Sequence, residues 1–400
     1  MKKYICKKCE NIIEIEKLDD DFICPKCGAL KDEFEEKTEN LANNDVNAII
    51  DSVIEDAIAK KTSKIINDIE ENKMVKISEY NPSITRVPEK CINCGQCKKT
   101  CEKIVNISYD LNLCKEPICI GCGQCLLNCP TGAIIPRYSY KEVKSIIDEN
   151  KKIVVAIIAP AVRVSIGEAF GMEPGENSEK KLVTSLKQLG FDYVFDTAFG
   201  ADLTILEEVA EFAARLKDKS KLPQFTSCCP AWVKYAEIYH PEILDHISTC
   251  KSPIGMQCAI IKSYFCETKG FDPSQVLTVA ITPCTSKKME MLKYDDVDLV
   301  ITTRELAKYL KDENIDIKRL KDSTFNALMS KGSGSGVIFG SSGGVTEATI
   351  REVYHILAKR RPKGRLLNFK EVRGLSNVKE TSITINGVTL KIAVINGTGD

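Results

Sequence analysis

Residues 90–101 read KCINCGQCKKTC, and residues 118–130 read ICIGCGQCLLNCP. Both stretches carry four cysteines in one spacing, with two residues between each of the first three and three residues before the last. The second stretch follows the first by about 28 positions, which makes this part of the chain an internal duplication. Cysteines grouped in this way within a long chain are typical of metal ligands. The two stretches therefore predict a pair of similar metal sites.

The bulk composition excludes several other classes of protein. The chain has 400 residues, enough for two or three domains, and its 56 basic and 56 acidic side chains balance. This balance gives no indication of nucleic acid as a partner. No apolar run reaches the length of about 18 residues that a membrane span needs. The N-terminus also lacks the apolar segment of a signal peptide, so we expect a cytoplasmic protein.

Four segments are expected along the chain. Residues 1–37 form a small metal-binding knuckle module, residues 38–80 a linker helix or an exposed spacer, and residues 81–135 the domain with both cysteine repeats. From residue 136 to residue 400, apolar runs alternate with amphipathic stretches, which predicts a large α/β domain. Strands are expected at residues 153–158, 276–281 and 299–301, helices at 180–189 and 203–216, and a hairpin at 381–385 and 388–395 around Asn386-Gly387.

The knuckle module carries Cys6, Cys9, Cys24 and Cys27 in two Cys-x-x-Cys pairs. Four thiolates on two tight turns form a tetrahedral site that suits iron or zinc. The stretch FICPKCGALKDEFE at residues 22–35 resembles the second knuckle of a rubredoxin, which implies a single bound iron. A zinc ribbon is the alternative.

The duplicated stretches have the cysteine spacing of bacterial two-cluster ferredoxins. In that fold the first three thiolates of a run hold one 4Fe–4S cube, and the fourth thiolate reaches the other cube. Cube one is therefore expected on Cys91, Cys94, Cys97 and Cys129. Cube two is expected on Cys119, Cys122, Cys125 and Cys101. Cys114 lies outside both runs and is expected to be a spare buried thiol.

Two later stretches carry a further resemblance. FTSCCPAW at residues 225–232 and TPCTSKKME at residues 282–290 resemble the first two signature loops of iron-only (FeFe) hydrogenases. Three more segments agree with that family in order: APAVR at 159–163, FDTAFGADLTILEE at 195–208 and GVIFGSSGGVTEA at 336–348. The resemblance implies a multidomain protein with a rubredoxin-like knuckle domain, an α+β two-cluster ferredoxin domain and a large two-lobed α/β catalytic domain.

The same resemblance implies an H-cluster, in which a 4Fe–4S cube is bridged to a two-iron subsite. Cys229 and Cys284 would be two ligands of this cube, whereas Cys228 would pass protons. Lys287 would donate a hydrogen bond to a cyanide of the subsite. The amide of Ala161 and the ring of Phe339 would line the pocket together with Thr282, which replaces the usual methionine of the family.

A proton path is expected beside these loops. Glu208, Glu211 and Arg215 are spaced so that they share one face of a helix. All three match the relay positions of the family, as does the hydroxyl of Ser248. A solvated charged face is the alternative reading of this spacing.

The expected activity is the reversible reduction of protons to H2 with electrons delivered through iron–sulfur clusters. Expected partners are ferredoxin or another small electron carrier, and the proteins that build the two-iron subsite. The alternatives are a hydrogenase-like protein without the subsite, active in cluster assembly, sensing or electron transfer, and a plain electron carrier.

The third cysteine loop of the family, which would complete the cube, has no counterpart here, because no cysteine follows Cys284. We therefore expect a chain that is incomplete at its C-terminus, and residues 1–400 alone should not evolve hydrogen.

Overall fold

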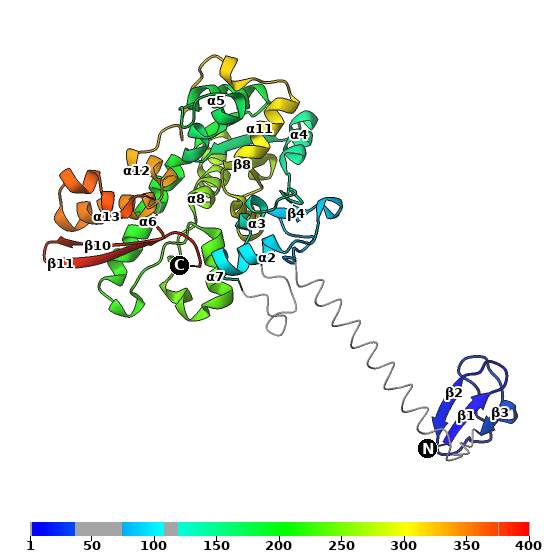
Figure 1. Cartoon of the computed structure of the whole chain (residues 1–400). Helices are drawn as coiled ribbons and strands as arrows, with labels where there is room; N and C mark the ends of the chain where they lie inside the picture. The colour runs from blue at the N-terminus through cyan, green and yellow to red at the C-terminus, as the bar shows by residue number, and fades with distance from the viewer. Residues whose placement is uncertain (1, 37–73, 108–118, 375, 400) are drawn as a thin grey trace. The chain divides into compact units, whose positions relative to one another are not determined.

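A computed structural model describes residues 2–36, 74–107, 119–374 and 376–399. The chain divides into two units, Met1–Glu71 and Asn72–Asp400, which are described separately (Figure 1). Cys114 and most of the expected linker lie outside the described residues. The described end of that linker, residues 74–80, contains no helix; Val75 in it is buried against the cysteine-rich core.

The first unit is a three-stranded antiparallel sheet with two cysteine turns. Its strands are β1 (Lys2–Cys6), β2 (Ile12–Ile15) and β3 (Phe34–Glu36), in the order β2-β1-β3. The buried apolar side chains among its described residues are Cys6, Leu18, Cys24 and Ala29. A core this small contributes little stability, and a metal ion bound by the four cysteines would add to it.

The duplicated cysteine region forms a compact subdomain of the second unit. Strands β4 (Ile84–Arg86) and β5 (Ile134–Pro136) pair in antiparallel fashion, and helices α2 (Gln96–Thr100) and α3 (Gln124–Leu127) lie against each other. Each helix begins directly after a glycine in the left-handed region, Gly95 with φ 72° and Gly123 with φ 75°. Only glycine takes this turn without strain.

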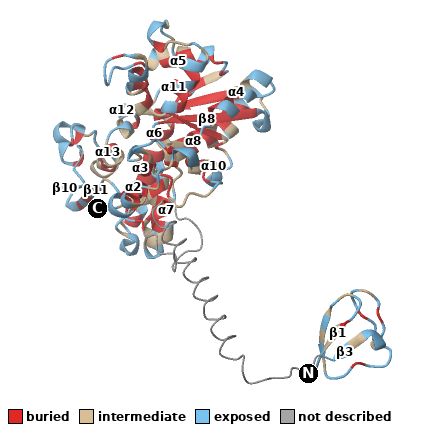
Figure 2. Ribbon diagram, turned by 45° about the vertical axis from the view of Figure 1, so that its right-hand side comes forward, coloured by how far each residue is buried: buried red, intermediate tan, exposed pale blue. Residues whose placement is uncertain are grey.

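A four-stranded parallel sheet forms the centre of the larger domain. Its strands are β6 (Ile153–Ile158), β7 (Tyr193–Asp196), β8 (Val276–Thr282) and β9 (Leu299–Thr302), in the order β7-β6-β8-β9. The three strands expected from apolar runs are confirmed, and β7 is an addition. Figure 2 shows β8 as a buried strand within the layers of helices.

Helices cover both faces of this sheet because alternate side chains of each strand point to opposite faces. One core joins Val154, Ala156 and Ile158 of β6 to α4 (Tyr140–Glu149), α5 (Glu179–Gln188) and α11 (Thr303–Asp312). The other core joins Val155 and Ile157 to α8 (Pro253–Ile260). The α/β class with a parallel sheet is thereby confirmed.

Further helices and one pair of strands lie outside this sheet. They are α6 (Ala198–Arg215), α7 (Pro230–Tyr239), α9 (Cys266–Lys269), α10 (Glu290–Lys293), α12 (Gly334–Val337), α13 (Gly344–Ala358), β10 (Val378–Ile385) and β11 (Val388–Ile395). The hairpin β10–β11 turns at Asn386-Gly387 as expected, with φ of 48° and 81°. Among the described residues, none of the helices combines the length and the apolar character needed to cross a membrane.

Candidate functional site

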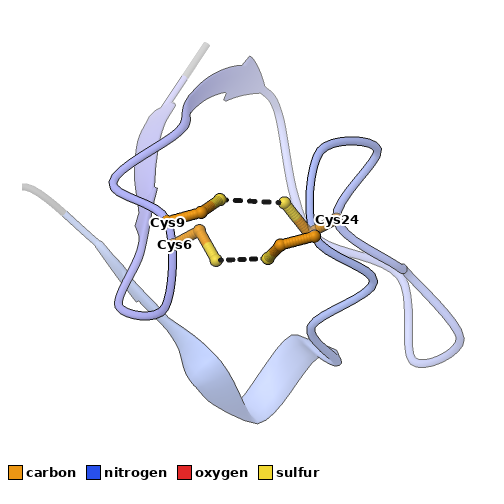
Figure 3. A group of neighbouring side chains, drawn as sticks. Cys6, Cys9 and Cys24 are labelled. Carbon is orange, nitrogen blue, oxygen red and sulfur yellow. Dashed lines mark hydrogen bonds between the residues drawn. The ribbon is translucent and has the colours of Figure 1, made fainter.

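The four cysteines of the first unit converge on one point. Their sulfur atoms all lie within 4.8 Å of one another. Figure 3 shows Cys9 facing Cys24, with 3.6 Å between the two sulfurs, and Cys6 is as close to Cys27. Burial opposes ionisation of Cys24, but the backbone N–H groups of Lys26 and Cys27 lower its pKa to about 6. Four converging sulfurs, one of them readily ionised, fit a tetrahedral metal ion.

The first proposed cube has a pocket of matching composition. Cys91, Cys94, Cys97 and Cys129 line one pocket, so the last cysteine of the second run joins the first three of the first run. The N–H of Val75 donates to Cys97 Sγ at 3.4 Å, and the N–H of Ala133 donates to Cys129 Sγ at 3.2 Å. Such N–H donors stabilise the charged sulfurs of an iron–sulfur cluster, so these residues fit the cube.

The second proposed cube lies in the core of the same subdomain. Burial raises the pKa of the Cys125 thiol, and the charges of Cys101 and Cys119 raise it further. Cys119 Sγ accepts the N–H of Gly121 at 3.4 Å. Burial also raises the pKa of Cys122 to about 11, with a contribution from the charge of Cys284. The second cluster loop therefore lies beside the second signature loop.

The two signature loops meet beside the carboxyl end of the sheet. Cys228 and Cys229 immediately precede α7, whose first residue is Pro230, and Cys284 follows β8 after Pro283. Cys228 is half-buried and Cys229 is exposed. Burial nevertheless raises the pKa of both thiols, to about 12 for Cys228, and the charge of Cys284 adds to the rise at Cys229. Iron bound at Cys229 would remove this penalty for that thiol, because the metal binds the thiolate form.

Lys287 is held by a buried network under these loops. Its Nζ donates to the carbonyl of Cys228 and to Glu290 Oε1, both at 2.7 Å. Glu290 Oε2 accepts the hydroxyl of Ser252, the N-cap of α8, at 2.8 Å. Burial lowers the pKa of Lys287, but the charge and hydrogen bond of Glu290, together with the charges of Cys228 and Cys284, outweigh it, so the pKa is raised overall and the ammonium stays charged.

Glu208 is the fully buried carboxyl nearest to the Cys228 loop. Among the described residues neither of its oxygens has a hydrogen-bond partner. Burial raises the pKa of Glu208 to about 7, and the nearby N–H of Ser227 only partly opposes the rise. The charge of Glu208 in turn raises the pKa of Cys228, after the effect of burial. A carboxyl that is half-protonated near neutrality is suited to pass protons.

A hydrogen-bonded cluster of Glu211, Ser248 and Arg215 lies beside a surface pocket. Glu211 accepts Ser248 Oγ at 2.7 Å and Arg215 Nη2 at 2.6 Å. The N–H of Thr249 adds a third bond at 3.1 Å. A surface pocket opens at Glu211, Arg215 and Thr249, with Asp245 on its rim. The structure thus brings Glu211, Ser248 and Arg215 together, whereas no hydrogen bond joins Ser248 to Glu208.

The other expected pocket residues lie on separate elements. Ala161 is in the 3₁₀ helix Pro160–Val164 after β6, and Phe339 is in the 3₁₀ helix Ile338–Gly340, which packs against it. A Cβ on Gly340 would lie 3.2 Å from the amide nitrogen of Ala161, so glycine permits this approach. Thr282 is the buried last residue of β8.

Two further residues were not among those expected from the sequence. Glu290 follows Lys287 by one helical turn, and that spacing could have indicated the ion pair. Thr285 donates its hydroxyl to the carbonyl of Gly121 at 2.8 Å. No local signal could have identified that contact, because the two residues are 164 positions apart.

Thiolate clusters beside an α/β domain define the class of an iron–sulfur, metal-binding oxidoreductase. Residues 152–400 match the model of the family described as "Iron only hydrogenase large subunit, C-terminal domain". The chain belongs to this family of iron-only hydrogenases.

Named relatives agree with this assignment. The chain is 45% identical to the periplasmic Fe hydrogenase large subunit of Nitratidesulfovibrio vulgaris, over 64% of this chain and 62% of that protein. It is 39% identical to iron hydrogenase 1 of Clostridium pasteurianum, over 80% of this chain and 59% of that protein. It is also 32% identical to the cytosolic Fe–S cluster assembly factor narfl of Danio rerio, over 58% of this chain and 62% of that protein. The chain thus spans about three fifths of the length of these relatives.

A solved structure agrees as well. Apo FeFe-hydrogenase HydA1 from Chlamydomonas reinhardtii superposes with a TM-score of 0.56 at 36% identity. The match covers 66% of this chain and 76% of that chain.

Proposed function

We propose that this polypeptide is the electron-carrying and catalytic part of an iron-only hydrogenase that interconverts protons, electrons and H2. The observation that carries the proposal is Glu208, a fully buried carboxyl without a partner among the described residues, next to the Cys228 loop. A protein that only held or moved clusters would gain nothing from such a costly group. A proton-transfer path explains it.

The cofactors follow from the thiolate groups. We assign one 4Fe–4S cube to Cys91, Cys94, Cys97 and Cys129. We assign a second cube to Cys119, Cys122, Cys125 and Cys101. The first unit would hold a single iron rather than zinc, because the rest of the chain handles electrons. Cys229 and Cys284 would be two ligands of the cube in the H-cluster, whose two-iron subsite supplies the redox chemistry of hydrogen when it is bound.

The residues around this group have separate roles in the proposal. Arg215 and Glu211 exchange protons with solvent at the surface pocket, and Ser248 receives them through its 2.7 Å bond to Glu211. Glu208 and then Cys228 carry the proton inward. Lys287, kept charged by Glu290, presents a buried cation to an anionic ligand. Ala161, Thr282 and Phe339 exclude water.

The partners of the proposal are a ferredoxin or other small electron carrier and the proteins that build the subsite. A cytoplasmic location stays our prediction, although one relative above is named as periplasmic.

The test is hydrogen evolution from reduced viologen by a polypeptide that carries residues 1–400 together with a third cysteine loop to complete the cube, produced together with the subsite maturation proteins. Hydrogen formation that depends on this maturation supports the proposal. Fully assembled clusters without any hydrogen formation would contradict it.

A second candidate function is iron–sulfur cluster assembly without hydrogen chemistry, which the 32% identity to narfl favours. That function would not need Glu208 or Cys228. If Glu208→Gln and Cys228→Ser both left cluster transfer to an apo-acceptor protein intact, and the wild type formed no hydrogen, this candidate would be preferred.

A further inference from the structure

Thr285 connects the two parts of the second unit that would hold different metal groups. It is the first residue of the 3₁₀ helix Thr285–Met289, directly after Cys284. Its hydroxyl donates to the carbonyl oxygen of Gly121 at 2.8 Å, and Gly121 directly precedes Cys122. The bond therefore joins the neighbour of one proposed ligand to the neighbour of another.

The two glycines that flank Cys122 make this approach possible. Gly121 and Gly123 have φ of +70° and +75°. A Cβ on Gly123 would lie only 2.8 Å from Thr285 Oγ1. A Cβ on Gly121 would lie 2.6 Å from Ser83 Oγ and 3.2 Å from Met289 Sδ, so Met289 of the same 3₁₀ helix also presses on the loop. Larger residues at either position would push the two loops apart.

We propose that Thr285 is a positioning residue that holds the second cluster loop against the catalytic loop, so that electrons cross between Cys122 and Cys284. With both groups bound, one electron would pass from the second cube, held by Cys119, Cys122, Cys125 and Cys101, to the group held by Cys284, so that the first is oxidised and the second reduced. No bond forms or breaks. The inference rests on the proposed function for its cofactors and deepens it, because it identifies the crossing point and the residue that keeps the distance short.

The same contact affects the second cube itself. The N–H of Gly121 donates to Cys119 Sγ at 3.4 Å. Hydrogen bonds to cluster sulfurs are among the factors that set the reduction potential, and donors favour the more negatively charged reduced state. By fixing the carbonyl of Gly121, Thr285 holds the turn in which this N–H faces the sulfur. Loss of the hydroxyl should therefore lower the potential of the second cube.

The test is Thr285→Val in the iron-loaded full chain, with an EPR-monitored redox titration of both cubes. The signal of the second cube is identified by its loss in Cys125→Ser. Thr349→Val is the matched control, because the buried Thr349 hydroxyl has no partner among the described residues. We expect Thr285→Val to shift the reduction potential of the second cube to a more negative value and to leave that of the first cube unchanged. The control should shift neither potential. An unchanged second-cube potential in Thr285→Val, or an equal shift in the control, would overturn the inference.

A glycine variant gives an independent measurement. Gly123→Ala should displace the loop and shift the same potential. Gly270→Ala is its control, since Gly270 has a similar φ of +70° and a Cβ there would have nothing within 4 Å. These titrations require no hydrogen chemistry. A shift without hydrogen formation would contradict the proposed function alone, and hydrogen formation without a shift would contradict this inference alone.

Discussion

The Nζ of Lys287 lies 2.7 Å from Oε1 of Glu290, with side-chain exposures of only 14% and 2%. Two charges removed from water in this way depend on each other. The pair explains how a lysine beside the Cys228 carbonyl can stay charged although burial alone would lower its pKa. Both partners of this ion pair lie within the second signature loop, residues 282–290.

Glu290→Gln should leave the Lys287 ammonium without its counter-ion. Breaking a buried pair on one side costs on the order of 3 kcal/mol of unfolding free energy. A raised lysine pKa stabilises the folded protein fully below about pH 10.5. At neutral pH, Glu290→Gln should therefore remove all of this stabilisation. Urea denaturation at pH 7 measures it. Glu237→Gln, on the neighbouring helix α7, serves as the control. Equal stability of the Glu290 variant and the wild type would contradict the role assigned to the pair.

The Glu211 contact with Arg215 predicts an acid-sensitive element. Burial opposes ionisation, but the hydroxyl of Ser248 and the guanidinium of Arg215 lower the pKa of Glu211 overall. Its stabilisation, about 1.5 kcal/mol for charge-assisted hydrogen bonds, is present above the unfolded value of 4.5 and is lost as pH falls below it. Glu211→Gln should therefore be less stable than wild type at pH 7 and similar at pH 3. A constant difference between these pH values would refute the assignment.

The contribution of Glu208 to stability should depend on pH in the opposite direction. Its pKa of about 7 lies above the ordinary 4.5, so the folded protein binds a proton that the unfolded chain releases. Stability should fall as pH rises from 4.5 through 7, by about 3 kcal/mol in total. Glu208→Gln mimics the protonated acid and should abolish this slope. The exposed neighbour variant Glu207→Gln should keep it. Denaturation curves between pH 5 and pH 8 give the comparison.

Much of this fold could be predicted because its strands are buried apolar runs. β6, β8 and β9 are read directly from such runs, and the hairpin is indicated by Asn386-Gly387. β7 was not predicted, because its four residues end in Asp196, a buried acid that is bound, among the described residues, by Arg163 and the N–H of Ala198. A partner so distant in sequence leaves no local signal.

The candidate site likewise contains some features that local sequence predicts and others that it does not. Cysteine spacing predicted the grouping of Cys91, Cys94, Cys97 and Cys129 around one pocket. Helical spacing predicted that Glu211 and Arg215 share a face. The contact of Thr285 with Gly121 depends on how two subdomains dock, and the buried pair of Lys288 and Glu305, 2.8 Å apart, depends on packing within the α/β domain. Such contacts follow from the tertiary fold and not from local pattern.

The crossed ligand sets can be tested by iron content. Cys91→Ala with Cys129→Ala should remove one cube, about four irons, because both residues serve the same cluster. Cys119→Ala with Cys129→Ala should remove both cubes, about eight irons. If the two double variants lost the same amount of iron, the crossed assignment would be wrong.

The most direct test of the central claim is hydrogen evolution by Cys228→Ser in an enzyme that also carries the third cysteine loop and is produced with its maturation proteins. A serine hydroxyl is nearly isosteric but a far weaker acid than the thiol. Removing a positioned proton carrier costs about 10²–10⁴-fold in rate. Cys266→Ser is the control, because the Cys266 thiol is buried in the core that also contains α8. We predict that Cys228→Ser loses at least 10²-fold in turnover with unchanged iron content and cluster spectra, while Cys266→Ser retains wild-type turnover. Wild-type turnover in Cys228→Ser would contradict the proton path.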